Sequence, residues 1–158
     1  MQTRWPASPL FQEYVQLMGE RAFDDAPARP LGEGDALLVI DMQCDFVPHD
    51  RASNPSGGRF GVAEGDHVVA PITRLIDAAV AGGATVVATR DYHPHDHTSF
   101  ASEGGPFPSH CVQGTDGARF LPPIAASLTT AMREAGNERT LIAFKGRPQP
   151  LRWAPARR

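Results

Sequence analysis

Three apolar runs in the sequence each lead to a charged side chain. Asp41 follows the first run, Asp91 comes two residues after the second, and Lys145 follows the third. In open α/β sheets, ligands bind at the carboxyl ends of the parallel strands. One charge at such a place is more often a surface residue that ends a strand. Three charges at the same edge of a sheet predict a functional site.

A histidine-rich loop continues from the second run. Asp91 and His93 have i, i+2 spacing, which turns both side chains to the same side of an extended segment. His97 lies four residues further on, and His110 lies in a proline-flanked segment. One carboxylate with two or three imidazoles is a ligand set for zinc, iron or manganese. A polar loop without metal is the alternative, but four of the six histidines gather here, and we predict a metal site.

Strands and helices alternate along the stretch that must position these side chains. Short, wholly apolar runs predict strands that are buried on both faces, at residues 36–40, 85–89 and 140–144. Amphipathic periodicity predicts helices between them, over about residues 69–82 and 124–135. This order predicts an α/β fold, with a Rossmann-like open, mostly parallel sheet and helices on both of its faces.

The remaining segments flank this domain. Residues 1–34 are expected to form an N-terminal extension with a short helix, and residues 35–146 form the domain itself. Residues 147–158 hold four arginines and no acidic residue, which predicts an unstructured basic tail.

The composition excludes several classes of protein. A net charge of −3 without a basic stripe argues against nucleic acid as a partner. No apolar run approaches the length of a membrane span, and the first residues lack the pattern of a secretory signal. Two cysteines, Cys44 and Cys111, are too few for a disulfide scaffold. We therefore expect a cytoplasmic protein with no membrane partner.

Val39-Ile-Asp-Met-Gln-Cys-Asp-Phe46 resembles the opening motif of the isochorismatase-like cysteine hydrolases. Segments 90–94, 97–101 and 108–115 resemble motifs of the nicotinamidase/pyrazinamidase branch of this family in particular, and segment 144–146 resembles the family's catalytic lysine segment. The resemblance covers about residues 36–146, in order, and is far more specific than any single motif.

The resemblance implies a metal-dependent amidohydrolase of NAD salvage, which converts nicotinamide to nicotinate and ammonia. It implies that Asp41 is the general base, which takes the proton of a cysteine thiol. It implies that Lys145 stabilises the resulting thiolate. We expect these two side chains on adjacent strands, near hydrogen-bonding or one-water distance.

The resemblance also implies one divalent metal ion, which is zinc, iron or manganese. Asp91, His93 and His110 would hold this ion. His97 is a further candidate ligand, because family members differ in whether the corresponding histidine binds directly. The metal would orient the pyridine nitrogen of the substrate.

Two phenylalanines complete the site that the resemblance implies. Phe46 would pack on the pyridine ring, and Phe107 stands where relatives often carry a tryptophan. The expected partner is a small molecule, nicotinamide or a similar aromatic amide, and a homo-oligomer is compatible with the sequence.

The sequence departs from the family after Lys145. In the family the nucleophilic cysteine lies on a later strand-to-helix turn, where a helix N-terminus stabilises the thiolate. The thirteen residues that follow Lys145 do not resemble this turn. We therefore expect a C-terminally truncated member, with an incomplete fold, no nucleophilic cysteine and no amidase activity. Cys44 and Cys111 flank predicted site residues, but neither holds the place of the nucleophile in the family's motifs.

Two other functions remain open. Another isochorismatase-like hydrolase would act on an N-carbamoyl or vinyl-ether substrate, and such branches generally lack the Asp-x-His metal set. A non-catalytic fragment would bind a metal or a ligand without turnover.

Overall fold

The computed structural model describes residues 9–18 and 29–146 of the chain. The chain divides into two compact units, Met1–Pro30 and Leu31–Arg158. In the first unit the described residues form helix α1 (Pro9–Met18), within the expected N-terminal extension. The predicted basic tail lies outside the described residues.

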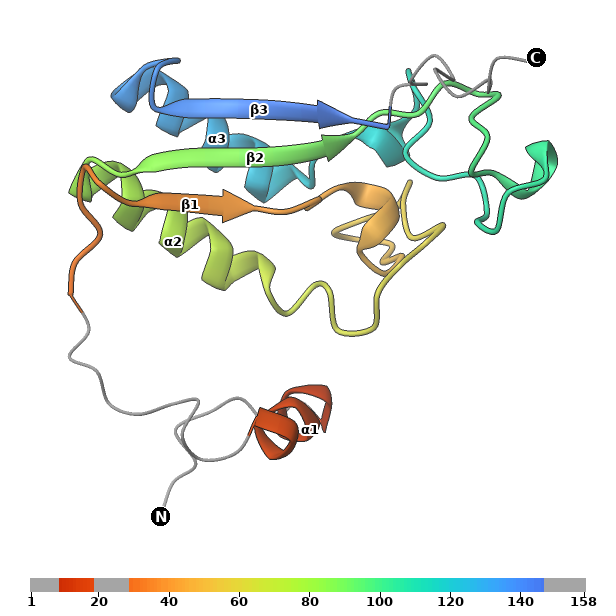
Figure 1. Cartoon of the computed structure of the whole chain (residues 1–158), viewed down its shortest axis with the longest axis horizontal. Coiled ribbons are helices and arrows are strands. Elements are labelled where there is room, and N and C mark those ends of the chain that lie inside the picture. The colour runs from red at the N-terminus through yellow and green to blue at the C-terminus, as the bar shows by residue number, and fades with distance from the viewer. Residues whose placement is uncertain (1–8, 19–28, 147–158) are drawn as a thin grey trace, which may run out of the picture. The chain divides into compact units, whose positions relative to one another are not determined.

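A three-stranded parallel sheet forms the centre of the second unit (Figure 1). Its strands are β1 (Ala36–Val39), β2 (Thr85–Asp91) and β3 (Thr140–Lys145), in the order β1-β2-β3. The register pairs Asp91 with Lys145 at the carboxyl edge. The predicted α/β fold with a parallel sheet is therefore confirmed.

Two helices connect the strands and pack on each other. Helix α2 (Val69–Gly82) ends where Gly83 takes a left-handed conformation, with φ of 77°, and caps the last turn. Helix α3 (Pro122–Ala135) begins with two prolines, whose missing N–H groups would have no helical partner there. Connections between parallel strands are right-handed, and the sheet order follows the chain order. In the part of the chain that the structure describes, both helices therefore lie on one face of the sheet (Figure 1), and not on both faces as predicted.

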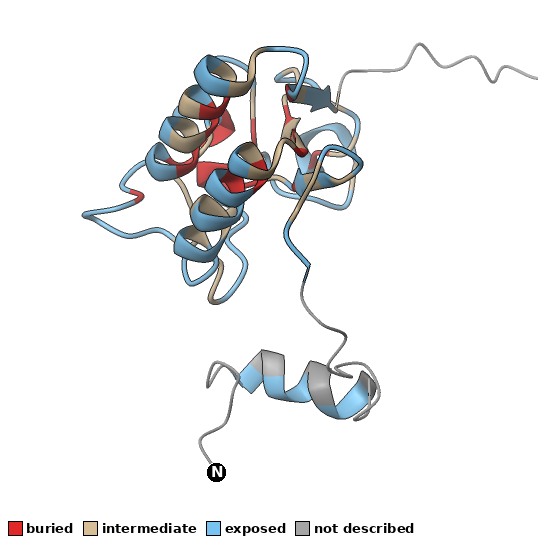
Figure 2. Cartoon of the chain, turned by 90° about the vertical axis from the view of Figure 1, so that its left-hand side faces the viewer, coloured by how far each residue is buried: buried red, intermediate tan, exposed pale blue. Residues whose placement is uncertain are grey.

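Burial differs between the two faces of the sheet (Figure 2). The helices cover a core in which Val39, Val86 and Ala88 are almost fully buried. On the opposite face, Leu38 and Leu141 are 58% and 45% exposed. The burial predicted for both faces of β1 and β3 is thus found on one face only in the described residues, because α2 and α3 share that face.

Long irregular connections leave the carboxyl ends of β1 and β2. Residues 40–68 include the short 3-10 helix η2 (Cys44–Phe46), and residues 92–121 include the 3-10 helix η4 (Asp116–Ala118). The helices η2 and η4 contact each other. These connections carry most of the predicted site residues. None of the helices that the structure describes is both long and apolar enough to cross a membrane.

Candidate active and metal-binding site

The three charged residues at the strand ends meet in one chain of ion pairs. Lys145 Nζ lies 2.7 Å from Asp41 Oδ2 and 2.7 Å from Asp91 Oδ1. The expected contact between Asp41 and Lys145 is present, but the expectation that they lie on adjacent strands is wrong. Strand β2 separates them, and the side chains of Lys145 and Asp41 together bridge the two strand spacings of about 4.8 Å each.

The ion pairs hold Lys145 in its charged form. Burial by itself lowers the pKa of this ammonium group, but hydrogen bonds and attraction from Asp41 and Asp91 outweigh burial and raise the pKa above its ordinary value. The carboxylates are the more enclosed partners, since the side chain of Asp91 is 11% exposed and that of Lys145 is 47% exposed. The cation is therefore shared between two carboxylates at the rim of the site.

The backbone of Asp41 adopts a left-handed conformation, with φ of 52°, which is uncommon for a residue other than glycine. Thr89 secures it from the neighbouring strand. The Asp41 N–H donates to Thr89 Oγ1 at 3.1 Å, and the Thr89 hydroxyl donates to Asp41 Oδ1 at 2.6 Å. Thr89 is a site residue that the sequence motifs did not mark. Thr89 lies two residues before Asp91 in the strand, so both side chains turn to the same face, and this spacing alone could have indicated it.

Asp91, His93 and His110 form a group whose potential metal-ligating atoms all lie within 4.8 Å of one another. The Nδ1 atoms of the two imidazoles lie 3.1 Å from Gly146 O and 2.7 Å from Pro108 O. An Nδ1–H that donates to a carbonyl leaves Nε2 with its lone pair, as in metal-ligating histidines. Burial lowers the pKa of His93 against the attraction of Asp91, which favours the neutral ligand form. These residues fit a divalent metal ion.

His97 lies beside this group but is not part of it in the described residues. Its ring centroid is 4.2 Å from that of His93. Its Nδ1 is 2.6 Å from Ser99 Oγ. The structure thus brings the imidazole of His97 next to the candidate ligands without bringing its ring nitrogens into the ligand group.

An aromatic cluster surrounds His110. The ring of Phe46 lies 5.5 Å from the His110 ring, and that of Phe107 lies 6.3 Å from it. Phe60, which no sequence motif marked, stacks on His110 at 5.1 Å and contacts the rings of both other phenylalanines. The predicted substrate residues therefore share one aromatic wall with Phe60, which comes from a glycine-rich segment without regular periodicity.

Both cysteines are buried and free. Burial, followed by repulsion from Asp45, raises the pKa of each thiol above its ordinary value, and strongly so for Cys111. The Cys111 thiol points to Gly117 O, at 3.9 Å. Neither thiol has the low pKa and the exposure that a cysteine nucleophile requires.

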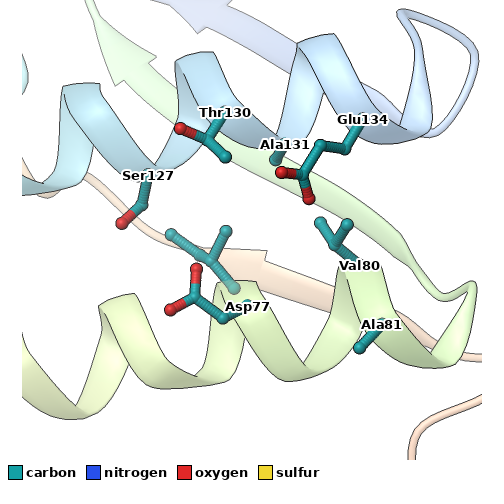
Figure 3. A pocket seen from close by; sticks show the side chains of 8 residues that line it. Asp77, Val80, Ala81, Ser127, Thr130, Ala131 and Glu134 are labelled. Carbon is teal, nitrogen blue, oxygen red and sulfur yellow. The ribbon is translucent and has the colours of Figure 1, made fainter.

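A separate groove of about 260 Å³ lies between α2 and α3 (Figure 3). Its lining residues come from these two helices alone: Ile76, Asp77, Val80, Ala81, Ser127, Thr130, Ala131 and Glu134. It contains none of the strand-end residues and takes no part in the site.

Known proteins are similar to this chain in sequence and in fold. The nicotinamidase of Escherichia coli is 35% identical over 116 residues, which are 64% of this chain and 51% of that protein. The nicotinamidase of Acinetobacter baylyi is 38% identical over 125 residues, 69% of this chain and 53% of that protein. The chain thus spans about half the length of these curated relatives.

Solved structures agree with these matches. The pyrazinamidase of Pyrococcus horikoshii in complex with zinc has a TM-score of 0.55 at 37% identity, over 76% of this chain and 55% of that chain. The yeast nicotinamidase bound to the inhibitor nicotinaldehyde has a TM-score of 0.56 at 27% identity, over 71% of this chain and 56% of that chain. Residues 35–134 match the isochorismatase domain. This match covers more than half of the chain, and the chain therefore belongs to the isochorismatase domain family.

Proposed function

We propose that this chain carries the metal-binding and proton-handling part of a nicotinamidase-type amidase, which converts nicotinamide to nicotinate and ammonia. The observation that carries the proposal is that Asp91 contacts both Lys145 and His93, and so links the predicted catalytic residues to the candidate metal ligands. One carboxylate oxygen of Asp91 pairs with Lys145 at 2.7 Å, and the other lies 3.5 Å from His93 Nε2. The proton-transfer residues and the candidate metal ligands are thereby joined in one site. The nicotinamidase relatives support the choice of substrate.

In this proposal Asp41 accepts the proton of an attacking thiol. The Thr89 hydroxyl and Lys145 hold the two carboxylate oxygens in a fixed direction, so that the base needs little reorganisation. The charge of Lys145 then stabilises the developing thiolate. Asp41, held in place by Lys145, then gives this proton to the amide nitrogen of the substrate, which leaves as ammonia.

The ligands for a divalent ion would be Asp91, His93 and His110, with His97 as an additional candidate. Such an ion, when bound, would orient the substrate through its pyridine nitrogen. The aromatic wall that includes Phe46 and Phe107 would pack on the pyridine ring, because ring stacking fixes an aromatic amide without a charge on the substrate.

We further propose that neither Cys44 nor Cys111 is the nucleophile and that the 158-residue chain alone binds the amide without turnover. Both thiols are buried with raised pKa values. A cysteine amidase works through a covalent acyl-enzyme, so the loss of the nucleophile alone removes most of the rate.

Ammonia release from nicotinamide tests this proposal. The purified chain with added Zn²⁺ is compared with a version extended through a cysteine-bearing strand-to-helix turn. Turnover in the extended version alone supports the proposal. Turnover by the 158-residue chain that disappears in Cys111→Ala contradicts it and makes Cys111 the nucleophile.

The second candidate is a non-catalytic chain that binds a metal or an aromatic ligand. Both thiols are buried, which favours a non-catalytic function. The Asp-x-His group argues against the remaining alternative, another isochorismatase-like hydrolase, because such branches generally lack it. Isothermal titration with nicotinamide in the presence of Zn²⁺, together with an extended version that still lacks turnover, would support the non-catalytic function.

A further inference from the structure

Gln43 is a fully buried polar side chain that takes no part in the proposed proton transfer or in metal ligation. Its exposure is 0%. Its Nε2 donates to Asp91 O at 2.7 Å and to Ala118 O at 2.9 Å, and its Oε1 accepts from the Asp91 N–H at 2.7 Å. The amide therefore holds both backbone groups of a candidate metal ligand.

The reason for this arrangement lies in the length of β1. The last residue of β1 that pairs with β2 is Val39, opposite Ala88. On the other side of β2, Tyr92 still donates its N–H to Lys145 O in β3. The backbone groups of Asp91 would have no strand partner on the β1 side, and a buried N–H or C=O without a partner is costly. The side chain of Gln43 takes the place of the missing strand.

Asp45, two residues further along the chain, does the same for the other ligand segment. Its exposure is 1%, and its Oδ2 accepts the N–H of Cys111, the neighbour of His110, at 2.8 Å. Cys111 has a left-handed φ of 47°, so this bond fixes a strained backbone beside the imidazole. Gly117 packs directly on the Asp45 carboxylate, where any side chain would collide with it.

We infer that Gln43 and Asp45 are positioning residues, which set the spacing between the Asp91–His93 segment and His110 before a metal binds. The two segments also contact each other directly, because the His93 N–H donates to Cys111 O at 3.0 Å. Ligands that are held in place by surrounding hydrogen bonds bind a metal more tightly than ligands that must first be ordered. The inference rests on the metal site of the proposed function, and it concerns affinity for the ion and not turnover.

Competition between the purified 158-residue chain and a chromophoric chelator for Zn²⁺ provides the first readout. Gln43→Met keeps the approximate shape of the side chain and removes all three hydrogen bonds. We expect its Zn²⁺ affinity to fall by about 10–100-fold. In the metal-free protein, the amide hydrogen of Asp91 should exchange faster with solvent in Gln43→Met than in the wild type.

Asn54→Leu is the matched control. Asn54 is 2% exposed and donates to the carbonyls of Cys44, Val47 and Pro48 in the same connection. Its loss should lower the melting temperature and should lower the Zn²⁺ affinity less than Gln43→Met does, because these bonds hold residues 44–48 and none of them reaches a ligand segment directly.

A second pair of variants tests Asp45. Asp45→Ala removes the acceptor for the Cys111 amide and should weaken Zn²⁺ binding by about tenfold or more. Asp45→Asn keeps an acceptor oxygen in the same place and should retain most of the affinity. If Asp45 contributed only to stability, Asp45→Asn and Asp45→Ala would bind Zn²⁺ with the same affinity.

The outcomes separate this inference from the proposed function. A wild-type chain that binds no Zn²⁺ contradicts the proposed metal site, while the exchange of the Asp91 amide still decides the role of Gln43. Wild-type affinity and unchanged Asp91 exchange in Gln43→Met would overturn the inference. If Gln43→Met does not fold, Gln43→Glu replaces it. This variant changes one heavy atom and loses at least one of the two donated bonds, and wild-type affinity in it would overturn the inference equally.

Discussion

The face of the sheet that α2 and α3 cover differs sharply from the face opposite, although the same three strands build both. Along β2, alternate residues turn to opposite sides. Val86 and Ala88 are fully buried against the helices. Thr89 and Asp91 belong to the other side, where the register places Asp91 beside Lys145. The core thus lies against the covered face, while Thr89, Asp91 and Lys145 turn towards the opposite face at the carboxyl edge of the sheet.

The open face is itself divided. The part nearer the amino ends of the strands is apolar, since Leu38 and Leu141 lie on either side of Val87 in the register. Its carboxyl end carries the charged residues. The comparison shows that the covered face supplies most of the described hydrophobic core, while the open face presents functional side chains. Substitutions on the two faces should therefore lower the free energy of unfolding by different amounts.

The largest expected effect lies on the covered side. Ile76 of α2 is 0% exposed, and Ile76→Ala should lower the free energy of unfolding by about 2–5 kcal/mol, because it removes buried methyl groups and leaves a cavity. Leu38→Ala, at a side chain that is 58% exposed, should cost less than about 1 kcal/mol. Urea denaturation measures both. An equal loss in the free energy of unfolding for the two variants would mean that the open face is covered in solution.

Removal of the shared cation should have the next largest effect. Lys145→Met leaves the carboxylates of Asp41 and Asp91 close together without a counter-ion, and we expect a loss of about 1–2 kcal/mol, moderated by solvent around the half-exposed lysine. The control is Arg139→Met. Arg139 has the same side-chain exposure of 47%, and the structure gives it an exposed ion pair with Glu33 at 3.7 Å and a hydrogen bond to Gly83 O at 3.3 Å. Its loss should therefore cost about 0–0.5 kcal/mol. Equal losses for the two variants would show that the strand-end pairs add no stability.

A smaller effect concerns pH and the thiol of Cys44, which belongs to the core of the covered side. Burial raises the pKa of Cys44 above its ordinary value of 9.0. The unfolded chain therefore releases this proton first, and the contribution to stability is complete below pH 9.0 and is lost as the pH rises through and above it. Between pH 8 and 10 the wild type should lose more stability than Cys44→Ala, by no more than about 1.4 kcal/mol. Thermal unfolding at several pH values measures it, and a parallel pH dependence of the two proteins would contradict it.

The smallest effect on stability is expected on the open face. Replacing Leu38 and Leu141 together by threonine should change the free energy of unfolding by less than about 0.5 kcal/mol for each site. The same double variant should associate less with itself, because exposed apolar patches promote contact between proteins. Analytical ultracentrifugation compares the two proteins. A large loss of stability would show that this face is packed in solution.

Much of this structure was predictable from local patterns. The apolar runs predicted all three strands, and amphipathic periodicity together with glycine predicted α2 and α3. The i, i+2 spacing of Asp91 and His93 predicted that both side chains would reach one point. Such predictions succeed because each depends on neighbours in the chain, whose relative geometry a strand or a helix fixes.

Other features had no local signal. Gln43 contacts residues 48 and 75 positions away in the sequence, and Asp45 contacts Cys111, 66 positions away. The stacking of Phe60 on His110 likewise joins two irregular connections. No periodicity marks such contacts, because irregular segments do not fix the direction of a side chain.

The sequence by itself determined which residues are charged at the ends of buried strands, where the helices begin and end, and which donor atoms a metal would find. Only the tertiary structure decided that β2 lies between Asp41 and Lys145, that both helices cover the same face, and that Gln43 and Asp45 hold the ligand segments. The physical reason is that strand order and side-chain contacts between distant segments depend on how the whole chain packs. Local propensity fixes the elements, whereas the burial of apolar faces and the need to pair every buried polar group fix their arrangement.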